Sequence, residues 1–308
     1  MQKVTMQDLG ALRFVSDISW SPNGEAAVFV QHSADIKENC YKSAIWVLEK
    51  GVCRRLTTGG SESSPQWLDE EHILFPGDRK KAHKAAPGQA VTVYNIINIH
   101  GGEAEEYFTV PLSVNRIRKL NEQEYLLVAT YDHYAIDITG LEGEEKEAAI
   151  AQIEENKDYE VFDELPFWGD GRGVINKKRS RLYLFNKESS ELKLLSPEFM
   201  NVGGFDYQEE NDSVLFFGSD YEWIDQRETD MYIKELHGEG CVKVKLDGKL
   251  SVSDAHFMNG QIYFSASDHA RYGTAQNPSQ YVADPISGDY KLLVDLDCSM
   301  NSSVGSDA

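Results

Sequence analysis

The sequence predicts an all-β protein of the β-propeller class, from a recurring four-strand pattern, its period and its turn chemistry. Near the N-terminus, the Ser-Pro-Asn-Gly turn at residues 21–24 separates a strand that ends at Trp20 from the apolar run 27–30. Proline presets φ for such a turn, and asparagine and glycine tolerate left-handed conformations. A second apolar run follows and continues through a short turn at Lys50-Gly51, which gives four strand-like segments in a row.

The same order of leading residue, turn and apolar run returns four more times along the chain. The five leading residues are Trp20, Trp67, Leu120, Tyr207 and Phe257. They recur about every 50 positions, apart from one much longer third step, and the partner strand of each repeat shows the same long step. A β-sandwich requires neither this period nor this fixed order. We therefore expect about five four-stranded blades, with an insertion between the second and third strands of the third.

Composition limits the function classes that remain. The 308 residues are 41% hydrophobic, enough for one large β domain, so residues 1–308 are predicted to form a single propeller domain. Thirty Lys and Arg against 51 Asp and Glu give a net charge of -21, which argues against nucleic-acid and membrane partners. The N-terminal residues lack the apolar core of a signal peptide, and we expect a cytoplasmic location.

Cysteine and histidine are scattered, which argues against a metal centre or a redox pair. The four cysteines show no close pairing and are predicted to be free thiols; they are Cys40, Cys53, Cys241 and Cys298. The histidines form no HExxH motif or His-rich run. The glycines at 169, 171 and 173 have the wrong spacing for a dinucleotide site. We therefore expect no metal and no other cofactor.

The insertion at residues 140–176 changes character along its length. Its first half, "EEKEAAIAQIEEN", predicts a short acidic helix, whose simplest interpretation is a solvated surface element. Its second half sets large apolar side chains among carboxylates and a lone arginine. Loops inserted in a propeller lie at one of its faces, where ligands and partner domains bind. The candidate substrate-binding residues are Asp163, Glu164, Phe167, Trp168, Asp170 and Arg172.

Three segments resemble the propeller of the prolyl oligopeptidase family of serine peptidases. They are "VSDISWSPNGEAAVFV", "IWVLEKGVCRRLTTGGSESSPQWL" and "DELPFWGDGRGVINKKRSRLYLFN". Related propellers such as TolB share the first hairpin, whereas the third segment combines the insertion with the strand after it. The resemblance covers essentially the whole chain and is strongest to the acylaminoacyl-peptidase and dipeptidyl-aminopeptidase-like branch.

The resemblance implies that this chain controls access of peptides to an active site but does not itself catalyse their hydrolysis. Family members carry a C-terminal α/β-hydrolase domain with a Ser, Asp and His triad on the same chain, and the propeller restricts entry to peptides. Here no G-x-S-x-G elbow is present, because "GGSES" at 59–63 fails at its last position. We therefore expect a peptidase fragment with no catalytic residue of its own. Relatives with dipeptidyl activity hold the substrate's amino terminus with acidic residues of a propeller insertion, a role for which Asp163, Glu164 and Asp170 are candidates.

Two other functions compete with the gating role. A TolB-like binding propeller with no peptidase partner is the main alternative, and a five-bladed glycosidase with paired carboxylates is the third possible function.

The number of blades bears on self-association. Five repeats end near Asp295, and "DLDCSMNSSVGSDA" resembles the start of another blade. An incomplete larger propeller would leave blade faces uncovered, so we expect self-association. A true five-bladed ring sealed near Phe14 is the alternative.

Overall fold

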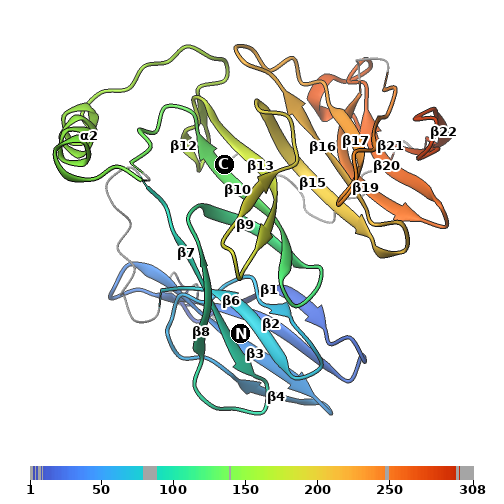
Figure 1. The fold of residues 1–308 in the computed structure, drawn as a ribbon. Helices are drawn as coiled ribbons and strands as arrows, with labels where there is room; N and C mark the ends of the chain where they lie inside the picture. Colours follow the sequence, from blue (N-terminus) through green and yellow to red (C-terminus); the bar gives the residue numbers. More distant parts are fainter. Residues whose placement is uncertain are drawn as a thin grey trace. The chain divides into compact units, whose positions relative to one another are not determined.

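In the computed structural model the regular secondary structure is almost entirely β-strand (Figure 1). The structure describes residues 10–78, 89–138, 140–246 and 250–295, together with Lys3, Thr5, Asp8 and Cys298. Chain contacts define two compact units. The first comprises Met1–Leu127, Ala135–Lys157 and Leu184–Leu192, and the second comprises Val128–Tyr134, Asp158–Tyr183 and Lys193–Ala308.

Five antiparallel four-stranded sheets account for most of the described strands, and each is one predicted blade. Blade one contains β1 (Arg13–Trp20), β2 (Ala26–Asp35), β3 (Cys40–Glu49) and β4 (Val52–Arg55). Blade two contains β5 (Gln66–Trp67), β6 (His72–Pro76), β7 (Thr92–Asn98) and β8 (Glu105–Val110). Blade three contains β9 (Ser113–Lys119), β10 (Glu124–Asp132), β13 (Lys178–Asn186) and β14 (Leu192–Leu194).

Blades four and five complete the series. Blade four contains β15 (Met200–Gln208), β16 (Ser213–Asp220), β17 (Asp230–Glu235) and β18 (Cys241–Lys243). Blade five contains β19 (Ser251–Met258), β20 (Gln261–Ser267), β21 (Ser279–Ala283) and β22 (Tyr290–Val294). In every blade, strands adjacent in sequence within the sheet are hydrogen-bonded neighbours. The all-β propeller prediction is confirmed, including the position of the third-blade insertion, which runs between β10 and β13.

The predicted turn and apolar runs form as the sequence chemistry requires. In the first hairpin, the Gly24 N–H donates to the Ser21 carbonyl at 2.9 Å, and Gly24 has φ +73°. The inner strands then supply the cores between blades. Blades one and two share a core that includes Val28, Ile45 and Phe75. Blades four and five share another, built of Leu215, Phe217, Met231, Ile233, Val244, Leu246, Leu250, Val252, Ala255, Ile262, Phe264, Ala266 and Ala283.

The insertion contains one helix and one small hairpin. The predicted helix forms as α2 (Gly143–Asn156), which buries none of its residues. The second half carries the two-stranded hairpin of β11 (Trp168–Gly169) and β12 (Gly173–Val174). Two 3-10 turns, η1 (Glu209–Asn211) and η2 (Gly273–Ala275), lie in blades four and five. No helix in the described part of the chain is long and apolar enough to cross a membrane.

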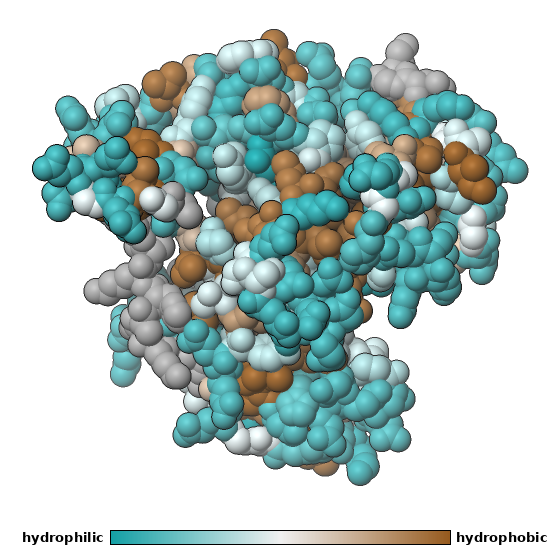
Figure 2. Space-filling view, in the orientation of Figure 1, coloured by the Kyte–Doolittle hydropathy of each residue, from teal (hydrophilic) through white to brown (hydrophobic). Residues whose placement is uncertain are grey.

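The visible face of the molecule is mostly hydrophilic, with apolar groups gathered in separate patches (Figure 2). This distribution agrees with the excess of acidic side chains. The proposed start of a further blade at 295–308 lies outside the described residues, apart from Asp295 and Cys298.

Candidate functional site

A buried ion pair fixes the second half of the insertion to blade three. The Arg179 guanidinium meets the Glu164 carboxylate through two hydrogen bonds, Nη2 to Oε2 at 2.7 Å and Nη1 to Oε1 at 3.2 Å. Both side chains are fully removed from solvent. Glu164 Oε1 also accepts the backbone N–H of Lys177 at 2.7 Å. This two-bonded geometry, with no solvent contact, defines one conformation of the loop around Glu164.

The Arg179 guanidinium has all five of its N–H donors in use. Besides the two bonds to Glu164, Nε donates to the Phe199 carbonyl at 2.9 Å and Nη2 to the Tyr221 carbonyl at 3.0 Å. Nη1 completes the set with the Lys178 carbonyl at 3.1 Å. The Tyr221 ring lies 4.1 Å from the guanidinium carbon. Arg179 therefore has no donor left for a ligand and holds the site together instead.

Lys177 makes the second link to the blade-four loop that follows β16. Its ammonium donates to the Glu222 carbonyl at 2.5 Å and lies 3.7 Å from the centre of the Trp223 ring. Lys177 is 3% exposed and has φ +53°, an uncommon backbone conformation for a residue with a side chain. Its conformation is maintained by contacts at both ends, because its N–H is bound by Glu164.

Backbone pairing makes the third link between the two loops. The Leu165 N–H donates to the Trp223 carbonyl at 2.8 Å, and the Asp225 N–H donates to the Leu165 carbonyl at 2.9 Å. These bonds form a parallel bridge between Leu165 and Ile224. We call residues 158–177 the insertion loop and residues 221–225 the blade-four loop. The two segments are joined by side chains and backbone alike.

Asn176 orders the stretch before Glu164. Its side-chain oxygen accepts the backbone N–H groups of Asp163 and Glu164, each at 3.2 Å. Its amide nitrogen donates to the Val161 carbonyl at 2.9 Å and to Asp163 Oδ1 at 3.3 Å. The Asn176 side chain thus makes four hydrogen bonds to residues 161–164 while remaining buried.

Asp163 presents a carboxylate beside this anchored segment. Its Oδ2 accepts a hydrogen bond from the Tyr134 hydroxyl. Burial acts to raise the pKa of Asp163, but hydrogen bonds from Tyr134 and Asn176 and the charge of Lys177 outweigh it and hold the pKa below its usual value. The same hydrogen bond raises the pKa of Tyr134 to about 12. Asp163 is therefore ionised at neutral pH.

Much of the exposed surface of the two loops is apolar. Eight side chains, each between 39% and 61% exposed, form what we call the insertion patch: Tyr159, Val161, Phe162, Leu165, Phe167, Trp168, Trp223 and Ile224. The rings of Phe162 and Phe167 lie 4.7 Å apart. Asp170 and Arg172 flank the patch, both exposed in the turn of the β11–β12 hairpin. Large exposed apolar groups rimmed by charges are typical of binding surfaces.

A second cation, Arg181, holds an imidazole at the edge of the site. Arg181 Nη2 lies 3.0 Å from His133 Nε2, and Arg181 Nε donates to the Glu198 carbonyl at 2.9 Å. The His133 ring stacks on Phe199 at 4.6 Å. Burial, then the charges of Arg181 and Arg179, lower the pKa of His133. His133 therefore accepts a hydrogen bond from Arg181 as a neutral ring.

The structure brings the six predicted site residues onto one loop but gives them different environments. Phe167, Trp168, Asp170 and Arg172 are exposed, and Asp163 is partly so. Glu164 differs from the expectation of direct substrate contact, because its carboxylate is enclosed with Arg179. Sequence reasoning missed the roles of the cations Lys177, Arg179 and Arg181. Their sequence signal was the basic cluster "KKRSR" at residues 177–181, which is followed by the apolar run 182–185.

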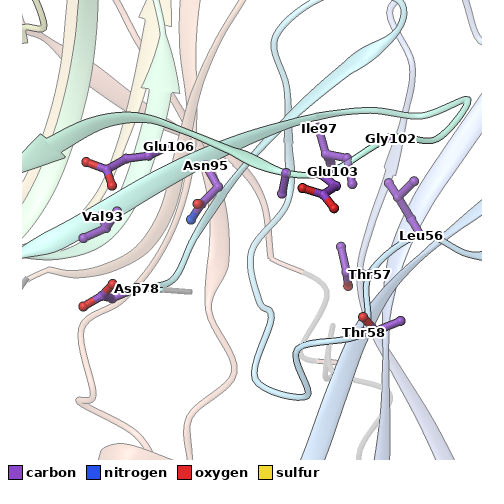
Figure 3. Close-up of a pocket in the computed structure, with 11 residues that line it drawn as sticks. Leu56, Thr57, Thr58, Asp78, Val93, Asn95, Ile97, Gly102, Glu103 and Glu106 are labelled. Atoms are coloured by element: carbon purple, nitrogen blue, oxygen red, sulfur yellow. The ribbon is translucent and has the colours of Figure 1, made fainter. Parts of the chain in front are cut away.

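A separate cavity of about 510 Å³ lies between blades one and two. Figure 3 shows Asn95 between two groups of lining residues, with Asp78 and Glu106 on one side and Thr58 and Glu103 on the other. Its described lining contains carboxylates, threonines and apolar groups but no histidine or cysteine.

The insertion loop offers contact groups rather than a covalent mechanism. It combines aromatic rings, an ionised carboxylate and an exposed guanidinium, which are groups that can contact both apolar and charged parts of a ligand. The imidazole of this cluster, His133, is held by Arg181 and not by a hydroxyl or thiol. The arrangement is therefore suited to binding and orienting a ligand.

Comparison with known proteins places this geometry in context. No protein-family model matches the chain. Over 205 residues the chain is 26% identical to the uncharacterized peptidase YuxL of Bacillus subtilis (strain 168). The matched region covers 63% of this chain and 28% of that protein.

Two solved structures show the same fold. Acylaminoacyl peptidase of Pyrococcus horikoshii is 14% identical with a TM-score of 0.55, over 93% of this chain and 47% of that one. A puromycin-hydrolyzing peptidase of Mycobacterium tuberculosis is 9% identical with a TM-score of 0.52, over 91% of this chain and 38% of that one. The chain thus spans less than half the length of each of these three proteins. These comparisons confirm its resemblance to the propeller of the prolyl oligopeptidase family of serine peptidases.

Proposed function

We propose that this chain is the substrate-gating propeller portion of a prolyl oligopeptidase-family serine peptidase, working with a hydrolase domain on the same polypeptide. The observation that carries the proposal is the insertion patch, an exposed, largely aromatic set of side chains on loops that the buried Glu164–Arg179 pair holds in place. The comparisons support it, because the match to acylaminoacyl peptidase covers nearly all of this chain and about half of that enzyme.

The insertion loop is proposed to bound the substrate cavity and to contact the peptide. Phe167 and Trp168 provide apolar surface for substrate side chains, and the ionised Asp163 and the exposed Asp170 suit a positively charged amino terminus. Arg172, on the turn of the hairpin, suits a carbonyl or carboxylate. Glu164 contributes by holding the loop. An acylaminoacyl-peptidase or dipeptidyl-aminopeptidase-like specificity is the finer proposal.

Serine-directed labelling tests whether the catalytic serine lies in another domain. Purified 308-residue chain and the full-length peptidase are each treated with a fluorophosphonate probe and with chromogenic peptide and ester substrates. The chain alone should show neither stoichiometric labelling nor turnover, and the full-length protein should show both. Labelling of one serine in the isolated chain would overturn the division of labour.

Two further properties belong to this proposal. Exposed free thiols at Cys40, Cys53 and Cys241 suit a reducing, cytoplasmic setting. Strand β1 exposes Val15, Ile18 and other large apolar residues, which favours self-association of the chain. Light scattering coupled to size-exclusion chromatography should then give a mass that rises with concentration, and a constant monomer mass would remove self-association from the account.

A further inference from the structure

Arg179 is the point at which three separate segments of the chain meet. Its guanidinium bonds the Glu164 carboxylate of the insertion loop, the Phe199 carbonyl before β15 and the Tyr221 carbonyl of the blade-four loop. The side chain has no solvent exposure. A planar group with five fixed donors satisfies all these acceptors at once, whereas an ammonium has three donors at a single point.

The remaining contacts between the two loops surround this centre. Lys177 bonds the Glu222 carbonyl, and Leu165 pairs with the backbone of Trp223 and Asp225. Tyr221, Glu222, Trp223 and Asp225 thus each make a backbone hydrogen bond to the insertion loop or to Arg179. The backbone bridge at Leu165 lies next in sequence to Glu164, so the ion pair directly limits the movement of the bridged residue.

We infer that Arg179 is a positioning residue that joins the insertion loop and the blade-four loop into one preformed binding surface. Both loops then contribute apolar side chains to the same ligand, since Phe167 and Trp168 come from one and Trp223 from the other. A surface ordered before binding loses less entropy when the ligand arrives. The inference deepens the proposed function and rests on it for the identity of the ligand, a peptide.

Hydrogen–deuterium exchange of the 308-residue chain tests the coupling. The variant is Arg179→Lys, which keeps the charge but cannot bond all the acceptors. The matched control is Arg181→Lys, the same change two residues along, where the arginine bonds His133 and the Glu198 carbonyl. In Arg179→Lys, exchange in peptides covering Leu165 and Asp225 should accelerate together by at least tenfold. In Arg181→Lys, exchange at both sites should stay within twofold of the parent.

Three exchange results would overturn the inference. They are acceleration at one loop only, acceleration at neither loop, and equal acceleration of both loops in Arg181→Lys. If Arg179→Lys fails to fold, Glu164→Gln replaces it, since the amide keeps the shape of the carboxylate but turns a donor toward the guanidinium. The same paired acceleration is expected there, and its absence counts against the inference in the same way.

Peptide turnover by the full-length peptidase separates this inference from the proposed function. Arg179→Lys should raise KM at least fivefold with a smaller change in kcat, because the loops must order around the peptide. Coupled exchange with unchanged turnover would leave the positioning role standing and remove the peptide-gating function. A raised KM without coupled exchange would remove the positioning role and leave the peptide-gating function standing.

Discussion

The two halves of the third-blade insertion contrast sharply, although they are consecutive in sequence. Helix α2 buries none of its residues and has no side-chain cap at its first turn. The insertion loop after it buries Glu164, Asn176 and Lys177, all of them polar. The helix forms from local propensity, whereas the loop depends on specific partners in β13 and in the blade-four loop. Polar residues therefore fix this loop, and its exposed apolar residues remain available for contact.

Removal of Arg179 should have the largest effect. Arg179→Met leaves the Glu164 carboxylate buried without a partner, and breaking a buried pair in this way costs about 3–5 kcal/mol. Urea unfolding of the chain measures the loss. Lys193→Met, an exposed control on β14, should change the free energy of unfolding by less than about 0.5 kcal/mol. Equal losses of unfolding free energy in the two variants would show that the ion pair does not stabilise the loop.

Removal of Asn176 should have an intermediate effect. Asn176→Ala deletes four hydrogen bonds and leaves the N–H groups of Asp163 and Glu164 without their acceptor, at a cost of about 1–3 kcal/mol. Limited proteolysis should then cut the chain between residues 158 and 166 faster than in the parent. A cleavage rate equal to that of the parent would show that the stretch is held without Asn176.

The stability of this region should fall in mild acid. The folded-state pKa of His133 lies below its unfolded value near 6.5, so the unfolded chain binds protons more readily as the pH falls. The favourable contribution is complete above about pH 6.5 and declines as the pH falls toward and through the folded pKa. Melting temperatures between pH 8 and 5 measure the decline. His133→Gln should flatten part of the pH dependence, and an identical profile would exclude His133 as its source.

Changes in α2 should have the smallest effect. Ile153→Ala shortens a partly exposed side chain on a helix that buries nothing, so the free energy of unfolding should change by less than about 0.5 kcal/mol. Thermal unfolding provides the measurement. A loss above about 1 kcal/mol would mean that the helix is packed as firmly as the loop, and the contrast between the two halves would disappear.

The features that sequence predicts well are those set by neighbours in the chain. The Ser21–Gly24 turn, the apolar inner strands and α2 each follow from residues a few positions apart, and all three form as expected. The long step between Leu120 and Tyr207 located the insertion because an extra segment displaces every later repeat. Period and turn chemistry were therefore sufficient for the fold.

The environment of Glu164 could not be predicted in the same way. Its partner Arg179 lies 15 residues later, and the acceptor carbonyl of Tyr221 lies 42 residues beyond Arg179. Nothing local distinguishes Glu164 from Asp163, although one is enclosed and the other reaches the surface. The basic cluster at residues 177–181 is visible in the sequence, but only the fold shows that Arg179 binds Glu164.

The sharpest test of the proposal that the insertion loop contacts the substrate is peptide turnover by the full-length protein. Trp168→Ala removes a large exposed ring from the insertion patch, and Ile153→Ala makes a matched truncation in α2. Trp168→Ala should lower kcat/KM about tenfold, as truncation of a contact residue worth about 1.4 kcal/mol would, at an unchanged melting temperature. Ile153→Ala should stay within about twofold of the parent enzyme. Equal kcat/KM values for the parent and both variants would contradict the claim.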